Sequence, residues 1–207
     1  MFTTLQLLFG CSEQSNKYIK NVTKDTLDEK FTKSIEDFKN RPIHKVLTEQ
    51  IIDTTSDEKL VQEVFDNLSE KLPTDYTKEY QTVLTWTKPR QAIYTIWLLE
   101  AEVNNGGFNQ FYSNSSGQFY KNLPAALKLV GATKFADLAE RANKTYEQEN
   151  EKITKHQDGT VEGFSKSYEN NPLNKFDDEF YSLYKAEDLQ QLQVNFIRKH
   201  KYEFTDK

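Results

Sequence analysis

Residues 89–104 read PRQAIYTIWLLEAEVN, and this stretch decides the fold. Apolar side chains fall on nearly every face of the helix that it predicts, and a helix that is apolar all round is a buried one. Pro89 suits the first turn of that helix, because a proline leaves no backbone N–H unsatisfied there. The run NNGG at 104–107 predicts the end of the helix, since Asn and Gly tolerate left-handed backbone. We therefore expect residues 89–104 to form the core of the domain.

Amphipathic helices are predicted on both sides of this core. Thr55 and Glu58 have the spacing of a capping box, which predicts the start of a helix over 57–72. Further helical patterns cover residues 43–52, 76–86, 124–130, 133–151 and, as one broken or two short helices, 177–200. No segment alternates with period two for long enough to predict a strand. The expected fold class is all-α: a compact, non-repetitive helical bundle in a single domain.

The N-terminal part of the chain differs from the predicted helical domain, which spans 41–207. Residues 12–40 are polar and read as a lead or tether that contains one amphipathic helix. Residues 1–11, MFTTLQLLFGC, end in a run similar to a bacterial lipobox, which makes Cys11 a lipidation candidate. The run is short and has no preceding Lys or Arg, so a chance apolar stretch is the alternative. The location is therefore open between a lipid-anchored protein of the cell envelope and a cytoplasmic one, with membrane contact only through a lipid on Cys11.

Composition excludes several classes of function. The 207 residues include 27 basic and 32 acidic side chains, a net charge of -5, which argues against direct binding of nucleic acid. One Cys excludes an internal disulfide framework, and the three His share no helix-face spacing. The sequence also lacks the common nucleophile, phosphate-loop and zinc motifs. We expect no catalytic residue, no metal and no cofactor.

Acidic residues are concentrated in the predicted helix 57–72. The ones that could form a surface for a basic protein partner are Asp57, Glu63, Asp66 and Glu70. The alternative is the ordinary solvated face of an amphipathic helix.

The strongest local signal is LEAEVNNGGFNQFYSN at 99–114. Glu100 lies in the predicted core, and a buried carboxylate needs hydrogen-bond donors. The nearest candidates are the backbone N–H groups of residues 106–108 and the amide of Gln110, which would make a polar latch holding the turn against the helix. A positive φ is expected at Gly106, so that Gly106→Val should destabilise the fold. The functional alternative is a small-molecule pocket, lined by Glu100, Asn104, Asn109, Gln110 and Asn114.

Three segments together resemble a known family: ExEVNNGGFNQFYSN at 100–114, ALKLVGA at 126–132 and NKFDDEFY at 174–181. The family is a largely uncharacterised bacterial one, known for a DNA-mimic protein, and the resemblance covers about residues 55–200. It implies an all-α, non-enzymatic protein whose surface Asp and Glu occupy the DNA-binding face of another protein. The residues that match the family motif are Glu100, Glu102, Asn104, Asn105, Gly106, Gly107, Phe108, Gln110 and Asn114.

Three functions follow as hypotheses. The first is a protein-interaction module that binds a basic or DNA-binding protein through acidic helix faces. The second is an envelope lipoprotein with a structural or immunity-like role, which depends on Cys11. The third is a small-ligand binder that uses the region of Glu100 and Gln110. The oligomeric state is open, with a homodimer among the alternatives.

Overall fold

The computed structural model describes residues 24–206, and every regular element in this range is a helix. The predicted all-α bundle is therefore confirmed. The longer helices are α1 Lys24–Lys39, α3 Asp57–Ser69, α5 Lys88–Ser113, α6 Leu123–Val130, α7 Thr133–Gln148, α10 Asn174–Leu183 and α11 Leu189–Lys199. The short ones are α2 Glu49–Thr54, α4 Glu79–Leu84, α8 Asn150–Thr154 and α9 Val161–Lys166, with 3₁₀ turns at Tyr76–Lys78, Ser115–Phe119 and Lys201–Glu203.

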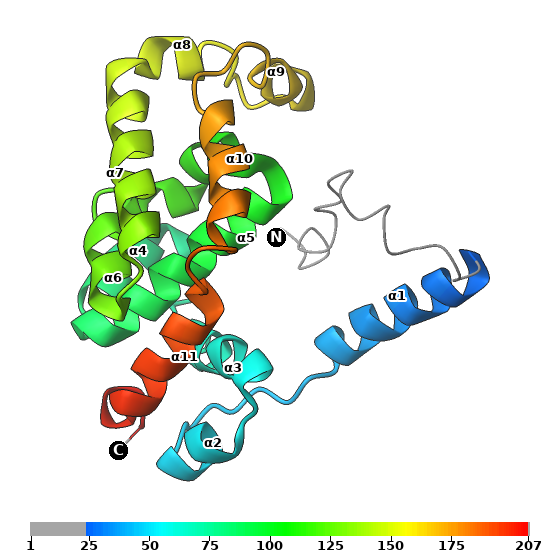
Figure 1. The fold of residues 1–207 in the computed structure, drawn as a ribbon, viewed down its shortest axis with the longest axis vertical. Helices are drawn as coiled ribbons and strands as arrows, with labels where there is room; N and C mark the ends of the chain where they lie inside the picture. The colour runs from blue at the N-terminus through cyan, green and yellow to red at the C-terminus, as the bar shows by residue number, and fades with distance from the viewer. Residues whose placement is uncertain (1–23, 207) are drawn as a thin grey trace.

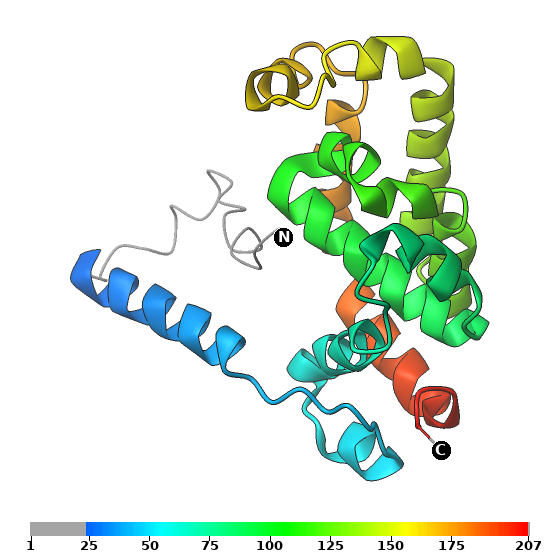
Figure 2. The ribbon, with the colours of Figure 1, turned by 180° about the vertical axis from the view of Figure 1, so that it is seen from behind.

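Helix α5 runs through the middle of the bundle, and α3, α6 and α10 pack directly on it (Figures 1 and 2). Its side chains at Ile93, Ile96, Leu99 and Val103 are at most 1% exposed. The prediction that residues 89–104 form the core is confirmed. Burial of each large aliphatic side chain contributes about 1.5–3 kcal/mol to folding, so this helix supplies much of the driving force.

The predicted interruption of the core helix at 104–107 is confirmed, because the backbone of Gly106 and Gly107 is not helical; what the sequence did not predict is that a helix resumes directly after them. Gly106 has φ -154° and ψ 27°, and Gly107 has φ 69° and ψ -174°. Helical backbone then continues from Phe108 to Ser113. The positive φ lies at Gly107, not at Gly106 as expected from the sequence. Two glycines thus place a sharp bend inside one long helix.

Helix α3 begins at residue 57 as predicted, but its N-cap residue lies one position later than the capping box indicated. Ser56, not Thr55, is its N-cap residue, and the helix ends at Ser69 rather than at residue 72. Thr55 directly follows the last residue of α2, and its hydroxyl donates to the carbonyl of Ile51 within that helix at 2.7 Å. Thr55 therefore closes the helix before it and does not open the one after it.

Helix α1 stands apart from the bundle in both ribbon views (Figures 1 and 2). A non-helical segment, residues 41–47, leads from it to α2, and we call this segment the strap. No helix within residues 24–206 has the length and apolarity to cross a membrane. Cys11, the lipidation candidate, lies outside the described residues.

Residues 203–206 fold back against the start of the domain. The guanidinium of Arg90, at the beginning of α5, donates to the carbonyls of Glu203 at 2.7 Å and Thr205 at 2.9 Å. The backbone N–H of Leu47 donates to the Asp206 carboxylate at 3.0 Å, and the N–H of Asp206 donates to the carbonyl of Leu47 at 2.9 Å. This reciprocal pair fastens one end of the strap to the bundle.

Candidate functional site

Glu100 lies on α5, but the predicted donors do not reach it. Its carboxylate accepts a hydrogen bond from the hydroxyl of Tyr184 at 2.6 Å and one from the amide of Gln193 at 2.8 Å. Burial raises the pKa of the Glu100 carboxyl, and these two bonds oppose that rise. Glu100 therefore ties the core helix to the C-terminal part of the bundle rather than to the glycine turn.

Glu102 takes the role that the sequence assigned to Glu100. Its carboxylate accepts hydrogen bonds from Gln110 Nε2 at 2.6 Å, Asn114 Nδ2 at 2.8 Å and Ser116 Oγ at 2.8 Å. The carbonyl oxygen of the Gln110 side chain in turn accepts from Asn105 Nδ2 at 2.9 Å. One carboxylate before the bend thus holds the helical segment after it. We call Glu102 and its three donors the latch.

Asp177, from α10, supports the bend from the other side. Its Oδ1 accepts the backbone N–H of Phe108 at 2.7 Å, which is an orphan donor at the start of the resumed helix. The carboxylate occupies the space that a Cβ on Gly107 would need. Burial is the main cause that raises the pKa of Asp177 to about 6. Tyr168 completes the arrangement with a hydroxyl that donates to the carbonyl of Gly106 at 2.8 Å.

The remaining polar residues of the motif are also bonded within the chain. Asn109 is fully buried, and its amide donates to Ser167 Oγ at 2.7 Å while its carbonyl oxygen accepts from Asn171 at 2.9 Å. Asn104 is exposed. A ligand pocket would need polar groups that are free to bind the ligand. The bonds of Asn109 within the chain therefore favour a structural role for the motif over a small-molecule pocket.

The four acidic residues predicted as a partner surface separate into two places. Asp57, at the start of α3, faces α11 and forms an ion pair with Arg198 at 2.5 Å. The hydrogen bond from Arg198 is the largest cause that lowers the pKa of Asp57. Glu63, Asp66 and Glu70 are three and four residues apart and so share one face of α3. We call these three residues the carboxylate row.

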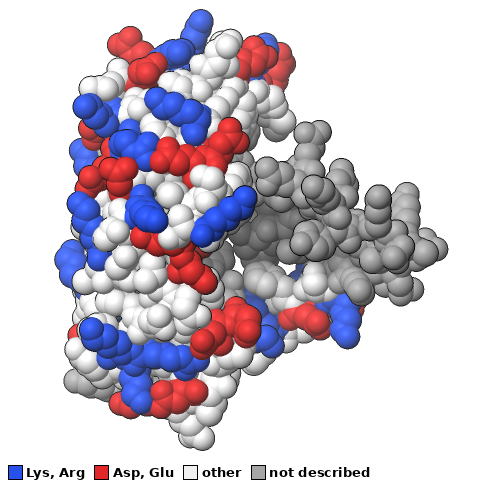
Figure 3. All heavy atoms as spheres, viewed as in Figure 1, with Lys and Arg blue, Asp and Glu red and all other residues white. Residues whose placement is uncertain are grey.

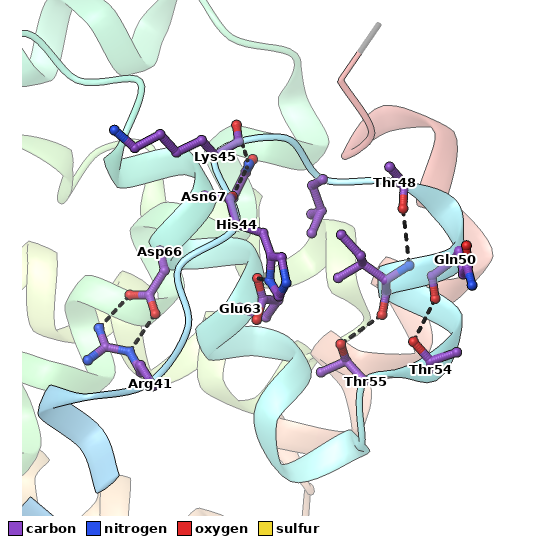
Figure 4. Close-up of polar contacts among 12 residues, drawn as sticks. Arg41, His44, Lys45, Thr48, Gln50, Thr54, Thr55, Glu63, Asp66 and Asn67 are labelled. Atoms are coloured by element: carbon purple, nitrogen blue, oxygen red, sulfur yellow. Dashed lines mark hydrogen bonds and ion pairs between the residues drawn. The ribbon is translucent and has the colours of Figure 1, made fainter. Parts of the chain in front are cut away.

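The strap lies along the carboxylate row (Figure 4). Arg41 donates to both oxygens of Asp66, from Nε at 2.5 Å and from Nη2 at 2.7 Å, and this Asp is only 6% exposed. His44 Nδ1 lies 2.7 Å from the Glu63 carboxylate. Bidentate guanidinium–carboxylate pairs are among the strongest polar contacts in proteins, so the first pair is the principal one.

The last member of the row makes a weaker contact. Lys45 Nζ lies 3.4 Å from Glu70, and both side chains are exposed. The backbone of the strap is held as well, because the amide of Asn67 donates to the carbonyls of His44 at 2.9 Å and Lys45 at 3.2 Å. Every carboxylate of the row therefore lies against a basic side chain of the strap.

An open groove of about 700 Å³ runs beside these pairs. The end of α1 and the strap line one wall, and the α2–α3 region lines the other, with Phe38, Arg41, His44, Thr55, Gln62 and Glu63 among the lining residues. Elsewhere the charges alternate: on the face shown in Figure 3, Lys and Arg are interspersed with Asp and Glu. In residues 24–206, no three His, Cys, Asp or Glu side chains are grouped so that they could hold a metal ion.

The sequence alone did not identify the residues that contact the carboxylate row, nor those that contact the bend in α5 and Glu100. Arg41, His44 and Lys45 put three basic side chains into five residues, a pattern that could have been matched to the carboxylate row. Asp177 lies inside the NKFDDEFY segment, which marked it as a motif residue without indicating its contact. Tyr184 and Gln193 carried no signal that would have linked them to Glu100.

Comparison with known proteins identifies the family that the motif at 99–114 suggested. The family model described as DMP19-like protein matches residues 84–200, which include α5, the latch and Asp177 but neither the strap nor the carboxylate row. No curated protein and no solved structure matches. The matched residues make up more than half of the chain, and the chain therefore belongs to the DMP19-like protein family, a family of DNA-mimic-like proteins.

Proposed function

We propose that the protein is a non-enzymatic interaction module that binds a basic, DNA-binding protein through carboxylates on the surface of α3. Membership of a DNA-mimic-like family supports this class of partner, because a protein that binds DNA presents Lys and Arg to the phosphates. Fold alone is weak evidence for function, so the proposal depends on the surface.

The observation that carries the proposal is the pairing of the carboxylate row with basic side chains of the same chain. Glu63, Asp66 and Glu70 are each contacted by a basic side chain of the strap. A helix face that binds three basic side chains in sequence within one molecule, the cations Arg41 and Lys45 among them, has the charge and spacing to bind those of another. Asp57 adds a fourth carboxylate near the start of the same helix.

The test is capture of DNA-binding proteins by the purified chain. A nucleic-acid-free bacterial extract is enriched on heparin, passed over the immobilised chain and eluted with duplex DNA. We expect basic DNA-binding proteins in the eluate, and we expect their loss with a variant that keeps side-chain volume: Asp57→Asn, Glu63→Gln, Asp66→Asn and Glu70→Gln.

A matched control removes exposed carboxylates at the other end of the molecule, with Glu149→Gln and Glu151→Gln. This control should capture the same proteins as the unaltered chain. Equal capture by the folded α3 variant would refute the proposal, since the carboxylates would then contribute nothing to the partner.

A further inference from the structure

The strap resembles a basic ligand seated on the carboxylate row. It is not helical, and Figure 4 shows Arg41 and His44 reaching from it to Asp66 and Glu63. Lys45, from the same segment, lies 3.4 Å from Glu70. Most of its side chains are exposed to solvent, although each of its three basic side chains contacts a carboxylate. Its position is therefore set mainly by charge and by a few backbone contacts, not by burial.

The two ends of the strap are held differently. At its C-terminal end, Leu47 is fully buried and exchanges two backbone hydrogen bonds with Asp206. At its N-terminal end, Arg41 is held by Asp66 and by Phe38, whose carbonyl accepts from the guanidinium at 2.6 Å. The guanidinium carbon also lies 3.8 Å from the centre of the Phe38 ring. Phe38 belongs to α1, which stands apart from the bundle, so α1 and Arg41 can leave together while Leu47 stays in place (Figures 1 and 2).

The groove gives a competitor access before the strap leaves. It is open to solvent and reaches Arg41, His44, Glu63 and Asp66. An incoming guanidinium could therefore approach the carboxylates from the groove and replace the strap one contact at a time. Gln62 lies at the same wall and donates to Asp66 at 2.8 Å, which keeps that carboxylate oriented when Arg41 moves away.

We infer that the strap is an autoinhibitory cover: it occupies the carboxylate row in the closed protein, and an extended, arginine-bearing segment of the partner binds by replacing it. This inference rests on the proposed function for the identity of the partner. It adds that the chain binds its partner more weakly than the bare row would, because only the fraction of molecules with an open strap is competent.

The experiment measures binding of a fluorescein-labelled hexa-arginine peptide to the full chain by fluorescence anisotropy at low salt. The unaltered chain is compared with Arg41→Ala/His44→Ala/Lys45→Ala. If the strap is closed in at least nine molecules of ten, its removal should tighten binding about tenfold or more. The gain should disappear when Glu63→Gln, Asp66→Asn and Glu70→Gln are added.

Two controls separate this effect from net charge and from unfolding. Lys144→Ala/Lys185→Ala removes two exposed cations away from the strap and should change the affinity by less than twofold. His44→Ala/Lys45→Ala keeps the partly buried Arg41–Asp66 pair, so it should fold and show a smaller gain. Circular dichroism checks that each variant is helical.

Equal affinity of the unaltered chain and both strap variants would overturn the inference. So would a gain that the charge control reproduces. A gain confined to the strap variants, without capture of any DNA-binding protein, would uphold the cover and refute the proposed function. Capture of a DNA-binding protein without any gain in peptide affinity would support the proposed function and refute the cover.

Discussion

Gly107→Ala tests whether the bend in α5 depends on the absence of a side chain. Gly107 has φ 69° and ψ -174°, a region of backbone that is essentially restricted to glycine. A Cβ at this position would also overlap the carboxylate of Asp177. That carboxylate would have to rotate away and would release the N–H of Phe108.

The size of the effect follows from these two causes. Backbone strain of this kind costs about 1–3 kcal/mol. A hydrogen bond to a charged group contributes about 1.5–3 kcal/mol, and the N–H of Phe108 would lose one. We therefore expect Gly107→Ala to lower the free energy of unfolding by roughly 3–5 kcal/mol. For a domain of this size, that corresponds to a fall in Tm of roughly 6–20 °C.

Urea unfolding and thermal melts followed by circular dichroism measure the loss. The matched control is Gly159→Ala, where φ is 83° but a Cβ would have no neighbouring atom within 4 Å, so only the strain of about 1–2 kcal/mol applies. Adding Asp177→Ala to Gly107→Ala should recover part of the loss by removing the overlap. The reasoning fails if Gly107→Ala costs no more than Gly159→Ala.

Three other variants examine the same region. Because burial raises the pKa of Asp177 to about 6 from an ordinary 3.8, the folded chain holds a proton between these values that the unfolded chain has lost. The free energy of unfolding should therefore fall as pH rises from 4 to 7, by about 2 kcal/mol more in the unaltered chain than in Asp177→Asn; parallel pH profiles in urea titrations would contradict this. Glu102→Ala leaves three donors without their acceptor and should lower stability by about 2–4 kcal/mol, whereas an unchanged urea midpoint would show that the latch is dispensable. Gly106→Val should also destabilise, by about 2 kcal/mol or more, because its side chain meets that of Gln110 and not because of a positive φ; a thermal melt that matches the unaltered chain would exclude the overlap.

The core helix could be predicted because its signal is local. Residues 89–104 are apolar on nearly every side, and no tertiary contact is needed to recognise a buried helix. The continuation to Ser113 could not be predicted in the same way. Local sequence offers two glycines, which normally end a helix, whereas the N–H of Phe108 is satisfied by Asp177, 69 residues further on. The two glycines interrupt the helix, and the distant acceptor Asp177 allows a helix to resume directly after them.

The same limit applies to the candidate site. The spacing of Glu63, Asp66 and Glu70 predicts a shared helix face from the sequence alone. That Arg41 and His44 would cover this face depends on how residues 41–47 turn back across α3, which no periodicity encodes. In the motif, the choice between Glu100 and Glu102 as the carboxylate of the latch also depended on which side of α5 faced the later helices.

The reciprocal hydrogen bonds between Leu47 and Asp206 impose an order of assembly, because they join positions 159 residues apart. A ribosome adds roughly 5–20 residues per second, so Asp206 is synthesised roughly 7–28 s after the carboxylate row. During that interval the two backbone hydrogen bonds between Leu47 and Asp206 cannot form. The C-terminal end of the strap therefore gains these two hydrogen bonds only after nearly the whole chain has been made.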